Sequence, residues 1–186
     1  MLVVLLTGES CVGKSTVAKS VGPLLGAPVV EEREVAHRLA LAAGFSRGRK
    51  WLKLAGFATV RHAIRDYTVA KLVELQEAPI VLVDGAYDYL YLDNIRTAVP
   101  RARTLTIHMV GGRIDMLNRM VQRLGGVLPE EARVELQFLH QTKYGSGMTR
   151  LIRESMTMGR YVRVYNRAGA FEQTCKIVVA AIRAAQ

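Results

Sequence analysis

Aromatic residues and cysteines are scarce in this chain of 186 residues. Aromatics make up 6% of the sequence, so its 50% apolar content is mostly aliphatic, which suits buried parallel strands and packed helices. The two cysteines, Cys11 and Cys175, lie far apart and lack metal-ligand spacing, so neither a disulfide framework nor a zinc site is indicated. No apolar run approaches the roughly 18 residues of a membrane span, and the opening run at 2–6 lacks a basic leader. We therefore expect a cytoplasmic protein without a membrane partner.

Acidic residues are also in the minority. The formal net charge is +10 and the pI is about 10. Such a balance favours polyanionic partners such as nucleotides or nucleic acid. The alternative is basic charge spread over a solvated surface, and an arginine-rich bias in genome composition accounts for the excess equally well.

Short apolar runs alternate with amphipathic segments, without a repeat or a linker. This alternation predicts one α/β domain over residues 1–186, with a parallel sheet flanked by helices. Five strands are predicted at 2–7, 28–30, 80–83, 104–109 and 161–165. Helices are predicted at 14–25, 32–43, 46–54, 59–76, 88–98, 129–144, 148–157 and 171–185, with a break at 145–147. One more helix is bounded by glycine pairs at 111–112 and 125–126, and its inward face is predicted to consist of Ile114, Leu117, Val121 and Leu124.

A glycine-rich loop follows the first predicted strand and matches the pattern G-x-x-x-x-G-K-S/T. Its glycines let successive N–H groups point at phosphate oxygens. Lys14 would bring positive charge to the β and γ phosphates, and the Ser15 hydroxyl would bind Mg²⁺. A chance match arises in roughly one chain in a hundred, but the preceding strand and the following amphipathic helix favour function. The sequence thus predicts ATP and Mg²⁺ as cofactors, held by Gly8, Glu9, Ser10, Cys11, Val12, Gly13, Lys14, Ser15 and Thr16.

Asp84 ends the third predicted strand and precedes Gly85. A carboxylate at the carboxyl end of a buried strand lies where open α/β sheets bind ligands. Beside a phosphate loop it would hold the Mg²⁺ shell, usually through water. The alternative is a simple turn, since Asp-Gly is a common turn pair.

Arg119 and Arg123 lie four residues apart and hence on one helix face, predicted to point away from the core. Two guanidinium groups there would clamp a phosphoryl group during transfer. An ordinary solvated face explains the same spacing.

Acidic and basic residues follow the second predicted strand. Glu31 and Arg33 could position an acceptor hydroxyl, or they could simply begin a helix. The basic stretch at 47–53, which contains Trp51, could bind a nucleobase, although a solvated helix with one buried tryptophan explains it too. The histidines are scattered and suggest no constellation.

The order of these features resembles the nucleoside monophosphate kinase branch of P-loop proteins. It is similar in particular to archaeal adenylate-kinase-related proteins and to dephospho-coenzyme A kinases. The resemblance rests on the loop at 8–16, on Asp84-Gly85, on Arg119 and Arg123, and on the strand that ends before Asn166.

The resemblance implies a three-layer P-loop kinase fold whose five-stranded parallel sheet has the order 2-3-1-4-5. It also implies an acceptor-binding segment at about 31–78 and a lid at about 112–155, with adenine held near Asn166 and Arg167. In such kinases an arginine often follows the third strand and grips the acceptor phosphate. Here the run at 84–88 has none, so the candidates to replace it are Arg38, Arg61 and Arg65.

The predicted function is transfer of the γ-phosphoryl group of ATP to a nucleotide-like or other small acceptor. Two alternatives remain open from the residues alone. The basic segments at 47–53 and 143–163 suggest a nucleotide-dependent switch acting on nucleic acid. A degenerate kinase fold that binds nucleotide only structurally is the other.

Overall fold

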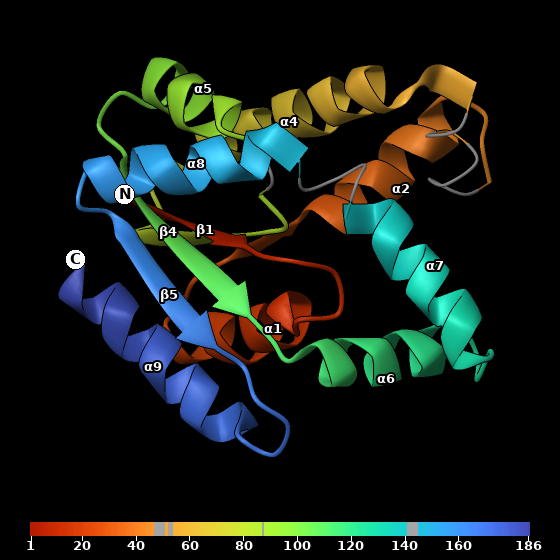
Figure 1. Ribbon diagram of the computed structural model, residues 1–186. Helices are drawn as coiled ribbons and strands as arrows, with labels where there is room; N and C mark the ends of the chain where they lie inside the picture. Colours follow the sequence, from red (N-terminus) through yellow and green to blue (C-terminus); the bar gives the residue numbers. More distant parts are fainter. Residues whose placement is uncertain (47–50, 52–53, 87, 141–144) are drawn as a thin grey trace.

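A central parallel sheet organises the chain (Figure 1). A computed structural model describes residues 1–46, 51, 54–86, 88–140 and 145–186. The strands are β1 (Leu2–Thr7), β2 (Val29–Glu31), β3 (Ile80–Asp84), β4 (Arg103–Val110) and β5 (Tyr161–Tyr165). Their order is β2-β3-β1-β4-β5, and all neighbouring pairs are parallel. The predicted sheet order is therefore confirmed.

The two central strands carry the most apolar sequence. Every residue of β1 and of β3 is buried, as expected for strands covered by helices on both sides. The register pairs Leu6 with Asp84 and Thr7 with His108. Because parallel strands end at one edge, this register brings Asp84 to the edge where β1 runs into the glycine-rich loop.

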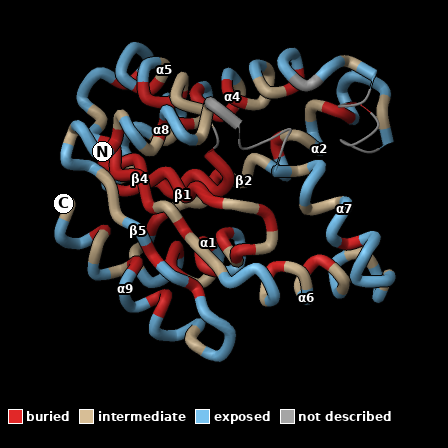
Figure 2. Tube along the Cα trace, in the orientation of Figure 1, coloured by how far each residue is buried: buried red, intermediate tan, exposed pale blue. Residues whose placement is uncertain are grey.

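Helices cover both faces of the sheet and make three layers (Figures 1 and 2). On one face α1 (Lys14–Leu24) and α9 (Phe171–Ala184) pack against alternate β1 residues such as Val4 and Leu6. On the other face lie four helices: α2 (Glu32–Ala42), α4 (Phe57–Glu74), α5 (Leu90–Ala98) and α8 (Gly145–Thr157). They pack against the intervening residues Val3 and Leu5. The period of two along β1 thus supplies both cores.

Two further helices, α6 (Arg113–Arg123) and α7 (Pro129–Leu139), project beyond the carboxyl ends of the strands and pack on each other (Figure 1). The predicted inward face of α6 is wrong at Ile114, while Leu117, Val121 and Leu124 are half-buried. Ile114 is 74% exposed, whereas Met116 and Met120 are the buried residues. A helix beyond the sheet edge has only a narrow surface to bury, so Ile114 stays in solvent.

The other boundaries agree with prediction to within a few residues, with one exception. α8 begins at Gly145, so the predicted break at 145–147 forms its first turn. The first amides of a helix need no intrahelical partner, which makes glycine tolerable there. The predicted helix at 46–54 and the end of the one at 129–144 fall largely outside the described residues. No helix in the described part combines the length and hydropathy needed to cross a bilayer.

Candidate phosphate-binding site

The loop between β1 and α1 lies tightly against the end of β4. Gly8 has φ of 132°, and a Cβ there would lie 2.2 Å from the Met109 carbonyl oxygen. Cys11 has a φ of 62°, a left-handed conformation that is uncommon for a residue with a side chain. These conformations curl the loop, so that its amides form a concave nest before α1. The N-terminal end of α1 adds a positive dipole at the same point.

Lys14 lies beneath this loop. Its side chain is buried, and Nζ donates hydrogen bonds to the carbonyl oxygens of Gly8 and Glu9, both at 2.8 Å. The ammonium group thus bridges the mouth of the nest. It is placed to exchange carbonyl oxygens for phosphate oxygens.

Asp84 lies at the neighbouring strand end and is 4% exposed. Its Oδ1 has no hydrogen-bond partner among the described residues. Burial raises the pKa of the carboxyl, while a hydrogen bond from Ser15 and the charge of Lys14 lower it. A buried carboxylate oxygen without a partner, next to a hydroxyl, is a set of donors that Mg²⁺ would complete. Ser15 and Asp84 therefore fit the predicted metal site.

Asn166 supports the loop from the far side. Its side chain is buried, its Nδ2 donates to the Val12 carbonyl at 2.7 Å, and its Oδ1 accepts from the Thr174 hydroxyl at 3.2 Å. Gly13 makes room for this contact, since a Cβ there would lie 2.4 Å from Nδ2. The sequence suggested only adenine contact for Asn166. In the structure its buried side chain also links α9 to the phosphate loop, and the adenine contact stays a prediction.

A cavity of about 240 Å³ opens beside Asn166. The loop after β4 and the loop after β5 form its walls, and an Asp115 oxygen accepts a hydrogen bond from the Ala168 amide at 3.2 Å, which joins the two loops. The exposed Arg167 lines the same cavity. Its lining consists of Val110, Gly111, Gly112, Asp115, Tyr165, Asn166 and Arg167.

The two arginines of α6 behave differently. Arg119 is half-buried, and its Nη1 donates to the Cys11 carbonyl at 3.1 Å. Arg123 is exposed. The prediction that both guanidinium groups point away from the core therefore misses the contact of Arg119 with the phosphate loop.

A second arginine pair converges after β3. Asp88 Oδ2 lies 3.6 Å from Arg61 Nη2 and also 3.6 Å from Arg65 Nη1. Arg65 is buried, and its Nη1 makes no hydrogen bond within the described residues. Asp88 is held in place because its Oδ1 accepts from the Leu90 amide at 3.1 Å. Arg65 also pairs with the exposed Asp66, whose Oδ1 lies 3.2 Å from Arg65 Nη2, so two guanidinium groups and two carboxylates meet on this side of the site.

The remaining acceptor candidates do not join that pair. Arg38 is exposed and pairs with Glu34 on its own helix. Arg33 is exposed, and Glu31 forms an ion pair with Lys19 at 3.2 Å. Of the basic residues proposed to hold an acceptor, the structure thus brings together only Arg61 and Arg65.

Histidines enter the site in ways that the sequence did not indicate. His140 Nδ1, just after α7, lies 3.1 Å from an oxygen of Glu9 in the phosphate loop. His108 on β4 lies 2.9 Å from the Tyr161 hydroxyl. Burial, together with the nearby charges of Arg163 and Lys14, lowers the pKa of His108 to about 4. The described residues contain no cluster of three or more His, Cys, Asp and Glu side chains that could hold a metal ion.

Neither a protein-family model nor a curated protein sequence matches this chain. Solved structures do. A gluconokinase from Sinorhizobium meliloti 1021 is similar with a TM-score of 0.63 at 17% identity, covering 97% of this chain and 90% of its own. A shikimate kinase from Bacteroides thetaiotaomicron has a TM-score of 0.63 at 14% identity, covering 98% of both chains. A shikimate kinase from Aquifex aeolicus has a TM-score of 0.62 at 17% identity, covering 98% of this chain and 96% of its own. The fold is that of the P-loop kinases.

Proposed function

We propose that this protein is an ATP-dependent small-molecule kinase. The observation that carries the proposal is the buried Asp84 carboxylate beside Ser15 and Lys14. A fold that binds nucleotide only structurally has little need of a buried carboxylate with one oxygen left without a hydrogen bond, because burying such a group destabilises the chain. The same carboxylate is useful where a metal ion and a triphosphate meet.

Charge stabilisation would be the main catalytic contribution of the chain. Mg²⁺, when bound, neutralises charge on the β and γ phosphates. Lys14 would turn from the carbonyls of Gly8 and Glu9 to phosphate oxygens, since a charged acceptor makes the stronger hydrogen bond. Arg119 already lies against the loop and would reach the transferring group from the lid at about 112–155. Arg123 would join it only if the lid moves.

The nucleobase would lie in the cavity of about 240 Å³ next to Asn166. This cavity lies beside the phosphate loop, because Asn166 lines the cavity and also donates to the Val12 carbonyl of the loop. One nucleotide would therefore reach both the cavity and the phosphate loop. Arg167 lies on its rim, where a planar guanidinium group could stack on a base.

The acceptor would carry an anionic group held by Arg61 and Arg65. Asp88 holds both arginines in place, and the buried Arg65 offers a nitrogen without a hydrogen bond among the described residues. A carboxylate or phosphate matches the planar fork of arginine. Hydroxy acids such as gluconate and shikimate, suggested by the names of similar structures, satisfy this requirement. So do nucleoside monophosphates and dephospho-coenzyme A, suggested by the sequence resemblance.

A coupled assay of ADP production over these four acceptor classes tests the proposal. We expect Lys14→Ala to abolish turnover. Arg65→Gln should raise the KM for the acceptor roughly tenfold to hundredfold, the cost of about 1.5–3 kcal/mol for a hydrogen bond to a charged group. Arg38→Gln is the matched control and should change neither constant, because Arg38 is exposed and held by Glu34. If ATP binds but no acceptor is phosphorylated, the proposal is wrong.

Nucleic-acid binding is the competing proposal, and one surface favours it. Residues 145–167 contain five arginines and one glutamate, and on the exposed edge strand β5 the Arg163 guanidinium lies 4.9 Å from the centre of the Tyr165 ring. An arginine stacked on an exposed aromatic ring is a surface on which bases can stack. Salt-dependent retention on an RNA column would support this role, and passage without retention at low salt would rule it out.

A further inference from the structure

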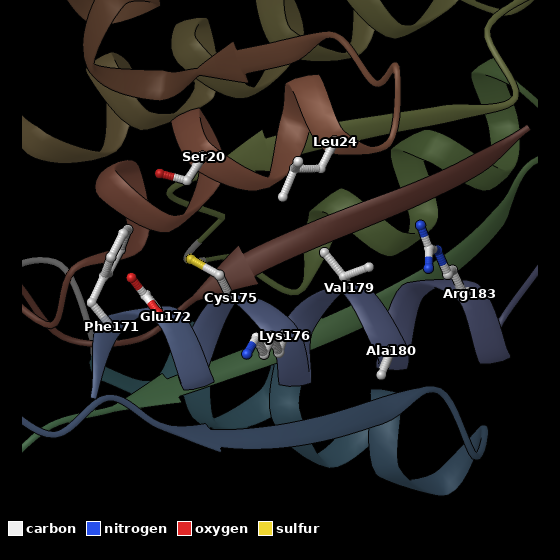
Figure 3. A pocket seen from close by; sticks show the side chains of 9 residues that line it. All are labelled: Ser20, Leu24, Phe171, Glu172, Cys175, Lys176, Val179, Ala180 and Arg183. Carbon is white, nitrogen blue, oxygen red and sulfur yellow. The ribbon is translucent and has the colours of Figure 1, made fainter.

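A groove of about 500 Å³ runs between α1 and α9, on the face of the sheet opposite α4 and α5 (Figure 3). Leu24 of α1 points toward Val179 of α9, and Ser20 of α1 and Cys175 of α9 line the same groove. Leu24 is 65% exposed, and Phe171 at the other end of the groove is 37% exposed. Apolar side chains with this much contact to water invite a partner.

The groove belongs to neither of the sites described above. The phosphate loop precedes the first residue of α1, whereas Leu24 is its last residue, which at 1.5 Å per residue places them about 15 Å apart. The acceptor side of the sheet carries α4, and the groove lies on the other face. ATP and the acceptor would therefore leave the groove open.

Charges of both signs line this groove. Glu172 lies at the start of α9, Arg183 near its end, and Lys176 between them. None of these three side chains forms a salt bridge within the residues that the structure describes. Together with Val179 they recur at spacings of four, three and four residues, which places all four along one line of the helix surface.

The charges along this line of α9 match those of a second α9 helix that runs in the opposite direction. In two α9 helices packed antiparallel about a two-fold axis near residues 177–178, Glu172 of each copy lies opposite Arg183 of the other. We infer that the groove between α1 and α9 binds a second copy of this chain through an antiparallel α9 pair. Such a contact is isologous and closes at two subunits.

The same geometry limits the strength of the dimer. The two Lys176 side chains come near the axis and repel each other, although their stems can lie along Val179 of the other copy while the ammonium groups reach water. Each subunit also carries a net charge of +10, which opposes association most strongly at low salt. We therefore expect a dimer that forms at micromolar or higher concentration and is clearest at about 0.15 M salt.

Sedimentation equilibrium of the full chain from 1 to 500 µM tests the inference by charge reversal. Glu172→Arg and Arg183→Glu should each weaken dimerisation about tenfold or more, because every reversal replaces two attractions by two repulsions. The double variant restores both pairs in the opposite sense and should return to within about threefold of the unaltered chain. Glu77→Arg, which makes the same charge change on an exposed residue outside the groove, is the matched control.

Lys176→Ala separates a second copy from an acidic peptide as the occupant. A self-pair loses a repulsion and tightens, whereas an acidic partner would lose an attraction. Circular dichroism of each variant checks that the fold is kept. A chain that stays monomeric up to 500 µM, or a double variant no better than the single ones, overturns the inference.

Discussion

Replacement of Asn166 tests whether a buried side chain on the β5–α9 connection holds the phosphate loop in shape. In Asn166→Ala the Val12 carbonyl loses its donor at 2.7 Å in a buried place, and an unsatisfied buried acceptor costs about 1–3 kcal/mol. The Thr174 hydroxyl can still donate to the Ala170 carbonyl at 3.0 Å, so only one group is left without a partner. For a domain of this size, a loss of about 2 kcal/mol lowers Tm by roughly 4–8 °C. Thermal unfolding without nucleotide measures it.

The isosteric change Asn166→Asp makes the test sharper. It keeps the acceptor for Thr174 but sets a carboxylate oxygen against the Val12 carbonyl, so it should destabilise more than alanine does at pH 7. The difference should shrink at acid pH, where a protonated carboxyl can donate again. Arg167→Ala changes the exposed neighbouring residue, and it should alter the free energy of unfolding by no more than about 0.5 kcal/mol. If Asn166→Asp is as stable as the unaltered chain, Asn166 does not support the loop as described.

Three further results follow from the geometry. Gly8→Ala should prevent folding because its Cβ would meet a backbone oxygen at 2.2 Å, whereas Gly26→Ala, with nothing within 4 Å, should cost about 1 kcal/mol in a chemical denaturation series. Asp84→Asn should abolish turnover yet raise Tm without nucleotide, since burial raises the pKa of Asp84 and its charged form therefore destabilises the fold; this gain should shrink as pH falls and the wild-type carboxyl protonates. Because the pKa of His108 is lowered to about 4, its imidazole should stay neutral above pH 5 by NMR, and it should contribute a loss of stability as pH falls from about 6.5 toward 4.

The sheet was predictable because its signals are local. The apolar runs at 2–7 and 80–84 are too short for anything but buried strands, and the glycine-rich loop fixes which strand comes first. α6 was not predictable in the same way. Its leucine and isoleucine residues have the right helical spacing, but periodicity cannot reveal that the helix lies beyond the sheet, where Met116 and Met120 are the buried residues.

The site was predictable as far as its motif extends. Lys14, Ser15 and Asp84 lie where the spacing placed them, because both strand ends are fixed by the sheet order. Asp88 was passed over as a residue in a run that lacks arginine. Its role depends on contacts with Arg61 and Arg65, more than twenty residues earlier, and no local pattern encodes such a contact. The support from Asn166 is likewise a long-range contact, 154 residues from Val12.

The cations of the two proposed substrate sites are held in opposite ways, and this difference has a chemical consequence. Lys14 and Arg119 donate to neutral loop carbonyls, so a triphosphate replaces weak acceptors by strong ones and gains from the exchange. Arg61 and Arg65 face the carboxylate of Asp88, and Arg65 also pairs with Asp66, so an anionic acceptor would compete with carboxylates already in place. Under the proposed function, the loop would therefore bind its phosphates tightly, whereas the acceptor side would bind more weakly and would select by how well a ligand shares two arginines with Asp88.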